Sequence, residues 1–108
     1  EGGLEVAMPS GTWRGVLAGR GELVVNLGDM MARWTNDRWK STLHRVANPS
    51  ALADAMSRRQ SIGYFMHPNY DATIECFPTC REAGTDPLYP SITAGAHIAE
   101  KIAKSHAI

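Results

Sequence analysis

The chain has 108 residues, a length that suits one domain, and 44% hydrophobic with 20% charged residues is ordinary for a globular protein. Lys plus Arg and Asp plus Glu each number 11, and this formal net charge of zero argues against a dedicated nucleic-acid-binding protein. No apolar run is long enough to span a bilayer, and two cysteines are too few for a secreted disulfide scaffold, so we expect a cytoplasmic protein with no membrane partner.

Short alternating runs between Gly- and Pro-containing turns predict β-strands along most of the chain. In chain order, strands are expected at residues 4–8, 13–17, 23–27, 43–46, 61–66 and 72–76. One helical turn is expected at residues 30–34, followed by a break at Asn36-Asp37. Thr93 is a candidate N-cap for an amphipathic helix over Ala94–His106. The pattern therefore predicts an all-β fold with a C-terminal helix, of the sandwich, jelly-roll or barrel type.

His44 lies in a predicted strand, at residues 43–46, and has two interpretations. One is a half-buried histidine whose ring bonds to a backbone carbonyl, which is the commoner role of a lone histidine. The other is a metal ligand, because neutral imidazole binds iron, zinc, copper and nickel. The residue and its local pattern leave both interpretations open.

Arg59 and Ser61 lie two residues apart where the predicted strand at residues 61–66 begins, so a strand would place them on one face. A guanidinium fork beside a hydroxyl suits a carboxylate, because it offers two parallel N–H bonds and one O–H bond. The alternative is an exposed arginine at a strand edge beside a turn serine. We assign no catalytic residue from the pattern.

Five motifs in one order decide between these interpretations. They are GGLEV at residues 2–6, VVNLGDM at 24–30, WTNDRWKSTLHRV at 34–46, RQS at 59–61 and YPSITAG at 89–95. The series spans essentially all 108 residues and resembles the C-terminal half of the isopenicillin N synthase-like family of iron(II)/2-oxoglutarate-dependent oxygenases. The block at residues 34–46 is the most specific of the five.

The resemblance implies a partial double-stranded β-helix, a kind of jelly roll, for residues 1–108. It implies that His44 is the distal histidine of a 2-His-1-carboxylate iron site. It also implies that Arg59 and Ser61 bind the far carboxylate of 2-oxoglutarate. The implied activity is a dioxygenase that consumes 2-oxoglutarate and O₂ and hydroxylates, desaturates or cyclises a small molecule.

The sequence departs from the family in lacking the His-x-Asp pair that supplies the other two iron ligands. That pair belongs upstream of Gly2-Gly3, so we expect a fragment without the N-terminal half of the jelly roll and inactive on its own. Exposed strand edges would then favour a homo-oligomer. The alternatives are a non-catalytic half-jelly-roll module that self-associates or binds a partner, and an oxidase of the same family that uses no 2-oxoglutarate.

Overall fold

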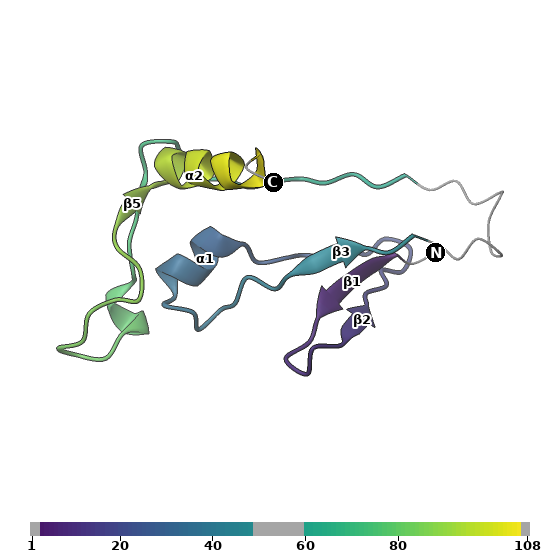
Figure 1. Ribbon diagram of the computed structural model, residues 1–108, viewed down its shortest axis with the longest axis horizontal. Helices are drawn as coiled ribbons and strands as arrows, with labels where there is room; N and C mark the ends of the chain where they lie inside the picture. Colours follow the sequence, from purple (N-terminus) through teal and green to yellow (C-terminus); the bar gives the residue numbers. More distant parts are fainter. Residues whose placement is uncertain (1–2, 49–59, 107–108) are drawn as a thin grey trace. The chain divides into compact units, whose positions relative to one another are not determined.

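A computed structural model describes residues 3–48 and 60–106 of the chain (Figure 1). The chain divides into two compact units. The first, here called the sheet unit, combines Glu1–Asn26 with Thr42–Gly63. The second, here called the helix unit, combines Leu27–Ser41 with Tyr64–Ile108. The chain therefore passes from the sheet unit to the helix unit and back before it ends in the helix unit.

The sheet unit contains a three-stranded antiparallel sheet with the strand order β2-β1-β3. β1 (Leu4–Ala7) and β2 (Trp13–Gly15) form a hairpin, and β3 (His44–Val46) pairs with the other edge of β1. In the hairpin turn the Gly11 N–H donates to the Met8 carbonyl at 2.9 Å, and the Gly11 φ of +82° is one that glycine adopts without steric cost. These strands confirm the predictions for residues 4–8, 13–17 and 43–46, although each is shorter than predicted.

The register of the sheet decides which side chains share a face. Val6 lies opposite Arg14 on β2 and opposite His44 on β3. Because successive side chains in a strand point to opposite faces, these three residues share one face of the sheet. Glu5 and Arg45, which are paired with each other, lie on the opposite face.

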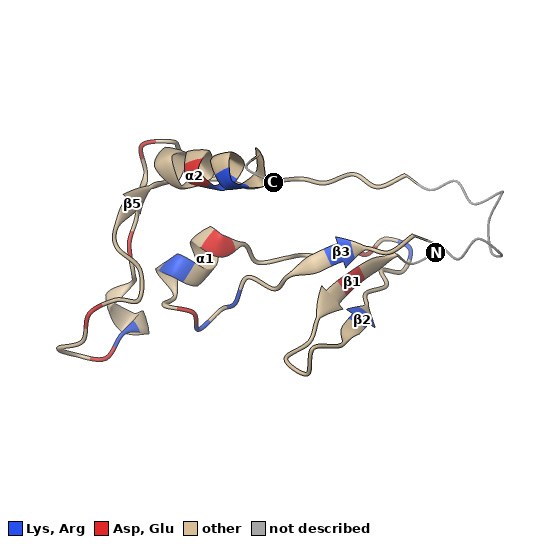
Figure 2. Cartoon of the chain, viewed as in Figure 1, with Lys and Arg blue, Asp and Glu red and all other residues tan. Residues whose placement is uncertain are grey.

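On that opposite face, one side chain from each strand joins a cross-strand cluster. Figure 2 shows an acidic residue on β1 and a basic one on the neighbouring β3. The Arg45 Nε donates to the Glu5 carboxylate at 2.8 Å, and the Arg45 guanidinium lies 4.0 Å from the centre of the Trp13 ring. Each contact is worth about 1 kcal/mol or less because the ion pair is exposed to solvent. Together they hold β3 in register and so fix where His44 emerges on the other face.

Two predicted strands, at residues 23–27 and 61–66, are wrong: neither segment belongs to a strand. Leu23 and Ile62 are each 90% exposed. Their β-branched and aromatic composition favours extended backbone, but a strand also needs a hydrogen-bonded neighbour. No strand among the described residues pairs with either segment. The all-β prediction therefore overstates the strand content, whereas the sheets and the C-terminal helix are present.

The helix unit has a small core around a two-stranded antiparallel sheet. β4 (Thr73–Ile74) pairs with β5 (Ile92–Thr93), which confirms a shorter form of the strand predicted at residues 72–76. Ile74 is fully buried, and α1 (Asp29–Trp34) packs against β4. A 3-10 helix follows at Pro78–Cys80. The helix predicted at residues 30–34 is confirmed by α1.

The turn after α1 is the predicted break, and it fixes a distant segment. Asn36 and Asp37 have φ values of 52° and 61°, a left-handed conformation that these short polar residues tolerate. The Asn36 side-chain oxygen accepts a hydrogen bond from the Leu88 N–H at 2.8 Å. The Tyr89 hydroxyl donates to the Asp37 carboxylate at 2.9 Å. Two residues in one turn thus hold a loop more than 50 positions further along the chain.

α2 (Ala94–His106) has the bounds that the sequence predicts. The Thr93 hydroxyl accepts a hydrogen bond from the Ala96 N–H at 3.3 Å, which confirms the predicted N-cap. Ala94 and His97 are buried on the inner face of α2. Neither α1 nor α2, the helices of the described residues, is long and apolar enough to cross a membrane.

Candidate functional site

His44 lies on β3 with its side chain exposed to solvent, so the imidazole is accessible to a ligand. The ring Nδ1 is 3.1 Å from the Thr42 carbonyl oxygen. Because a carbonyl oxygen only accepts, a neutral ring that makes this bond carries its proton on Nδ1, and its Nε2 then has a free lone pair. Metal-binding histidines almost always donate their other ring N–H to such a group, which fixes the tautomer and the ring orientation. His44 therefore combines the carbonyl bond of the first interpretation with the accessible nitrogen that the second requires.

The predicted carboxylate-binding pair is placed only in part. Ser61 is exposed in the extended segment of the sheet unit, and Arg59 lies outside the described residues. The argument that Arg59 and Ser61 share a face assumed a strand at residues 61–66, and that strand is absent. Their role in binding 2-oxoglutarate stays a prediction that depends on the family resemblance.

As a donor, His44 fits an iron site, because an accessible imidazole nitrogen is an ordinary iron ligand. The other ligands of a facial triad are not gathered near it in the part of the chain that the structure describes. Residues 3–48 and 60–106 contain no group of three or more His, Cys, Asp or Glu side chains that could hold a metal. His44 would thus supply one ligand of a set that needs additional donors.

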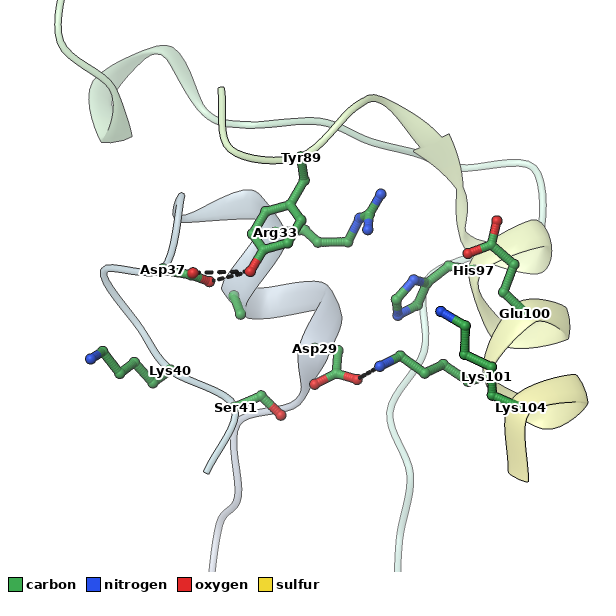
Figure 3. Close-up of a pocket in the computed structure, with 11 residues that line it drawn as sticks. Asp29, Arg33, Asp37, Lys40, Ser41, Tyr89, His97, Glu100, Lys101 and Lys104 are labelled. Atoms are coloured by element: carbon green, nitrogen blue, oxygen red, sulfur yellow. Dashed lines mark hydrogen bonds and ion pairs between the residues drawn. The ribbon is translucent and has the colours of Figure 1, made fainter. Parts of the chain in front are cut away.

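A second candidate site is a cavity of about 500 Å³ in the helix unit, between α1 and α2 (Figure 3). We call it the lysine cavity, because its wall includes Lys40, Lys101 and Lys104, which are all the lysines of the chain. Its other basic residue is Arg33. Its lining comes from three separate segments of the chain.

Two carboxylates of the lysine cavity are held by contacts within the wall. Asp29 forms an ion pair with Lys101, and the Lys101 and Ser41 hydrogen bonds hold the pKa of Asp29 below its ordinary value. Asp37 accepts the hydrogen bond of Tyr89, which raises the pKa of the Tyr89 hydroxyl because the bond favours the protonated form. Figure 3 shows both contacts as dashed lines.

Arg33 is partly held inside the same wall. One of its terminal nitrogens donates to the Pro90 carbonyl at 3.0 Å, and its guanidinium lies 5.1 Å from the centre of the Tyr89 ring. Its Nε is buried and has no hydrogen-bond partner. A buried donor without a partner is costly, so this atom lowers the stability of the wall.

His97 is 95% buried in the wall of the cavity, since only 5% of its surface is exposed. Burial lowers the pKa of its imidazole, and the neighbouring charges of Arg33 and Lys101 lower it further. The carboxylates of Asp29 and Glu100 act in the opposite direction but do not reverse the shift. His97 is therefore neutral at neutral pH, and the field around it is net positive.

The lysine cavity was missed at the level of sequence, although one signal was present. His97, Lys101 and Lys104 are spaced by four and three residues and so lie on one face of α2. Lys101 and Lys104 also lie near the C-terminus of α2, where basic side chains suit the helix dipole whether or not a cavity is present. The contact with the loop around Tyr89 was not predictable from local spacing.

Comparisons with known proteins address the family directly. The model of the 2OG-Fe(II) oxygenase superfamily matches residues 1–68. The chain is 47% identical over 92 residues to a 2-oxoglutarate-Fe(II) type oxidoreductase of Emericella nidulans, an alignment that covers 84% of this chain and 25% of that protein. It is 36% identical over 100 residues to homoarginine-6-hydroxylase of Oryza sativa subsp. japonica, which covers 92% of this chain and 29% of that protein.

Solved structures give the same result. A 2OG-Fe(II) oxygenase family protein from Caulobacter crescentus superposes with a TM-score of 0.79 at 35% identity, over 95% of this chain and 34% of that one. A full-length Neurospora crassa protein solved in complex with alpha-KG superposes with a TM-score of 0.77 at 32% identity, over 96% of this chain and 32% of that one. The chain thus spans about a quarter to a third of the length of these relatives. It belongs to the 2OG-Fe(II) oxygenase superfamily.

Proposed function

We propose that this chain contributes to a non-haem Fe(II)/2-oxoglutarate-dependent dioxygenase that oxidises a small molecule. In this proposal His44 is one iron ligand, and Arg59 and Ser61 bind the far carboxylate of 2-oxoglutarate. The proposed fold of the whole domain is a double-stranded β-helix, of which residues 1–108 form the C-terminal part. Iron(II) with 2-oxoglutarate supplies the oxidation of a C–H bond by O₂, and the reaction is hydroxylation, desaturation or ring closure.

The observation that carries the proposal is the arrangement of the His44 ring. Its Nδ1 is committed to the Thr42 carbonyl at 3.1 Å, which leaves Nε2 free on an exposed side chain. The cross-strand cluster on the opposite face of the sheet, made by Glu5, Arg45 and Trp13, limits how far β3 can shift. The chain thereby presents the His44 Nε2 in a fixed orientation, as a residue that supplies one ligand of an iron site must.

Two comparisons support the choice of co-substrate and substrate class. The Neurospora crassa protein, which superposes over 96% of this chain, was solved with alpha-KG bound. The rice relative is named a homoarginine-6-hydroxylase, and homoarginine is a small molecule. By analogy we propose a small organic substrate for this chain. A planar Arg59 guanidinium beside the Ser61 hydroxyl suits the carboxylate of the co-substrate.

The proposal is tested by titrating iron(II) into the chain under nitrogen with 2-oxoglutarate, and following the weak visible charge-transfer band of the chelate. In parallel, Mn(II) replaces iron and the broadening of each histidine ring signal is measured by NMR. We expect His44 to broaden at lower Mn(II) than His67 and His106, which are exposed elsewhere in the chain. We expect 2-oxoglutarate to increase that preference.

His44→Ala and His67→Ala form the matched pair of variants, because both remove an exposed imidazole. A charge-transfer band that disappears in His44→Ala and persists in His67→Ala supports the ligand assignment. Arg59→Ala is expected to weaken the effect of 2-oxoglutarate without removing the preference for His44. Equal broadening of His44, His67 and His106, with or without 2-oxoglutarate, would contradict the proposal that this chain presents His44 as an oriented metal ligand.

A further inference from the structure

The distribution of lysines in this chain is uneven. Its three lysines are Lys40, Lys101 and Lys104, and all three line the cavity between α1 and α2. The rest of the basic residues are arginines, and among the arginines of residues 3–48 and 60–106 only Arg33 lines the same cavity. Four basic residues therefore line one space of about 500 Å³, against three acidic residues.

Contacts within the wall leave part of this positive charge uncompensated. Lys101 is paired with Asp29, and Asp37 holds the Tyr89 hydroxyl. Lys104 makes no ion pair among the described residues. The remaining acidic residue of the wall, Glu100, is exposed, as Lys40 and Lys104 are, and four basic residues against three carboxylates leave a formal excess of one positive charge.

Arg33 and His97 both belong to the wall of the cavity. The Arg33 Nε is buried without a partner, and the depressed pKa of His97 reflects its burial together with the charges of Arg33 and Lys101. Figure 3 shows His97 between α1 and α2, with the amino group of Lys104 extending toward it from α2. Lys40 lies at the far side of the cavity, and its amino group extends away from His97.

We propose that the lysine cavity binds a small oxyanion, with phosphate or carboxylate oxygens placed between Arg33 and Lys104 beside His97. Such a ligand gives the guanidinium an acceptor and balances the ammonium charge of Lys104. Guanidinium and ammonium groups are the side chains that bind such oxygens most strongly, through charge-assisted hydrogen bonds. This site is independent of the iron site proposed above, because none of its residues lies in the sheet unit.

The lysine content makes the proposal directly measurable. Reductive methylation with ¹³C-formaldehyde labels each lysine amino group and keeps its positive charge, so the labelled chain has one NMR signal for each of three lysines. Sodium phosphate is titrated against sodium chloride of equal ionic strength, at a pH near 7.5. We expect a saturable shift of the Lys104 signal, a smaller one for Lys101, and little change for Lys40.

Lys104→Gln and Lys40→Gln are the matched variants, because both replace an exposed lysine of the same cavity. Lys104→Gln is expected to weaken phosphate binding about ten-fold, the loss of one charge-assisted hydrogen bond, as read from the Lys101 signal. Lys40→Gln is expected to change it by less than about two-fold. A parallel titration with succinate decides whether phosphate or carboxylate is the preferred source of the oxygens. Shifts that do not saturate, that chloride reproduces, or that both variants reduce equally would overturn the proposal.

Discussion

Burying the imidazole of His97 has a consequence for stability. Its usual pKa is 6.5, and burial with the nearby charges of Arg33 and Lys101 lowers that pKa in the folded chain. Below pH 6.5 the unfolded chain therefore binds more protons than the folded chain. We expect the free energy of unfolding to fall as the pH is lowered from 6.5 toward the folded pKa, with a slope of at most about 1.4 kcal/mol per pH unit.

Urea unfolding between pH 7.5 and pH 4.5 measures this slope, and two variants separate its causes. His97→Gln removes the titrating group and should flatten the dependence in that window. His67→Gln, which removes an exposed histidine, should leave the dependence unchanged. Asp29 also has a lowered pKa, but its contribution is lost only below its ordinary value of 3.8, in a separate and more acidic window. An unchanged slope in His97→Gln would contradict the assignment.

Individual residues also show where sequence reasoning reached its limit. His44 could be singled out because a local block of sequence carries it, and the structure adds the Thr42 carbonyl that orients its ring. Arg33 and Tyr89 could not be paired, because they are 56 positions apart and no periodicity links them. The lysine cavity depends on such contacts, whereas a motif depends only on neighbours along the chain.

At the level of elements, α2 begins with a close contact between Gly95 and Tyr70 that the helical pattern of the sequence does not reveal. Gly95 lies in its first turn, where alanine would normally stabilise a helix by about 1 kcal/mol. A Cβ at Gly95 would meet the Tyr70 ring at 2.5 Å and the Tyr70 carbonyl oxygen at 3.1 Å. The backbone cannot withdraw easily, because the Gly95 N–H donates to that same carbonyl at 2.9 Å.

We therefore expect Gly95→Ala to destabilise the chain by about 1–3 kcal/mol, as overpacked substitutions do, measured by urea unfolding. Gly15→Ala is the control, because a Cβ there meets nothing within 4 Å. In a strand that change should be neutral or stabilise by up to about 1 kcal/mol. A stabilising Gly95→Ala would show that Tyr70 moves away freely.

The elements differ in how far local signals define them. The bounds of α2 follow from the cap at Thr93 and the helical spacing, both of which lie within the helix or next to it. The segments at residues 23–27 and 61–66 carry equally clear strand patterns but have no partner strand in the described residues. A helix satisfies its own backbone, whereas a strand depends on a neighbour that its own sequence does not specify.

At the scale of the whole molecule, those same segments expose a large apolar surface. Leu23 and Val25 are 90% and 81% exposed, and Tyr64 and Phe65 are 87% and 81% exposed. Exposed apolar side chains favour association, and unpaired backbone can add a strand from another chain. We therefore predict that the 108-residue chain self-associates in solution, in line with the homo-oligomer expected from its sequence.

Sedimentation velocity over a hundred-fold range of concentration tests this prediction. The chain should sediment as a mixture whose mean mass rises with concentration. Val25→Lys and Phe65→Lys, which place a charge in each apolar segment, should shift the equilibrium toward monomer, because each buried side chain contributes about 1.5–3 kcal/mol to association. Arg20→Lys, a conservative change at an exposed turn residue, should have no effect. A single monomer boundary at every concentration would contradict self-association. The apolar side chains of these two segments would then have to pack against other residues of the same chain.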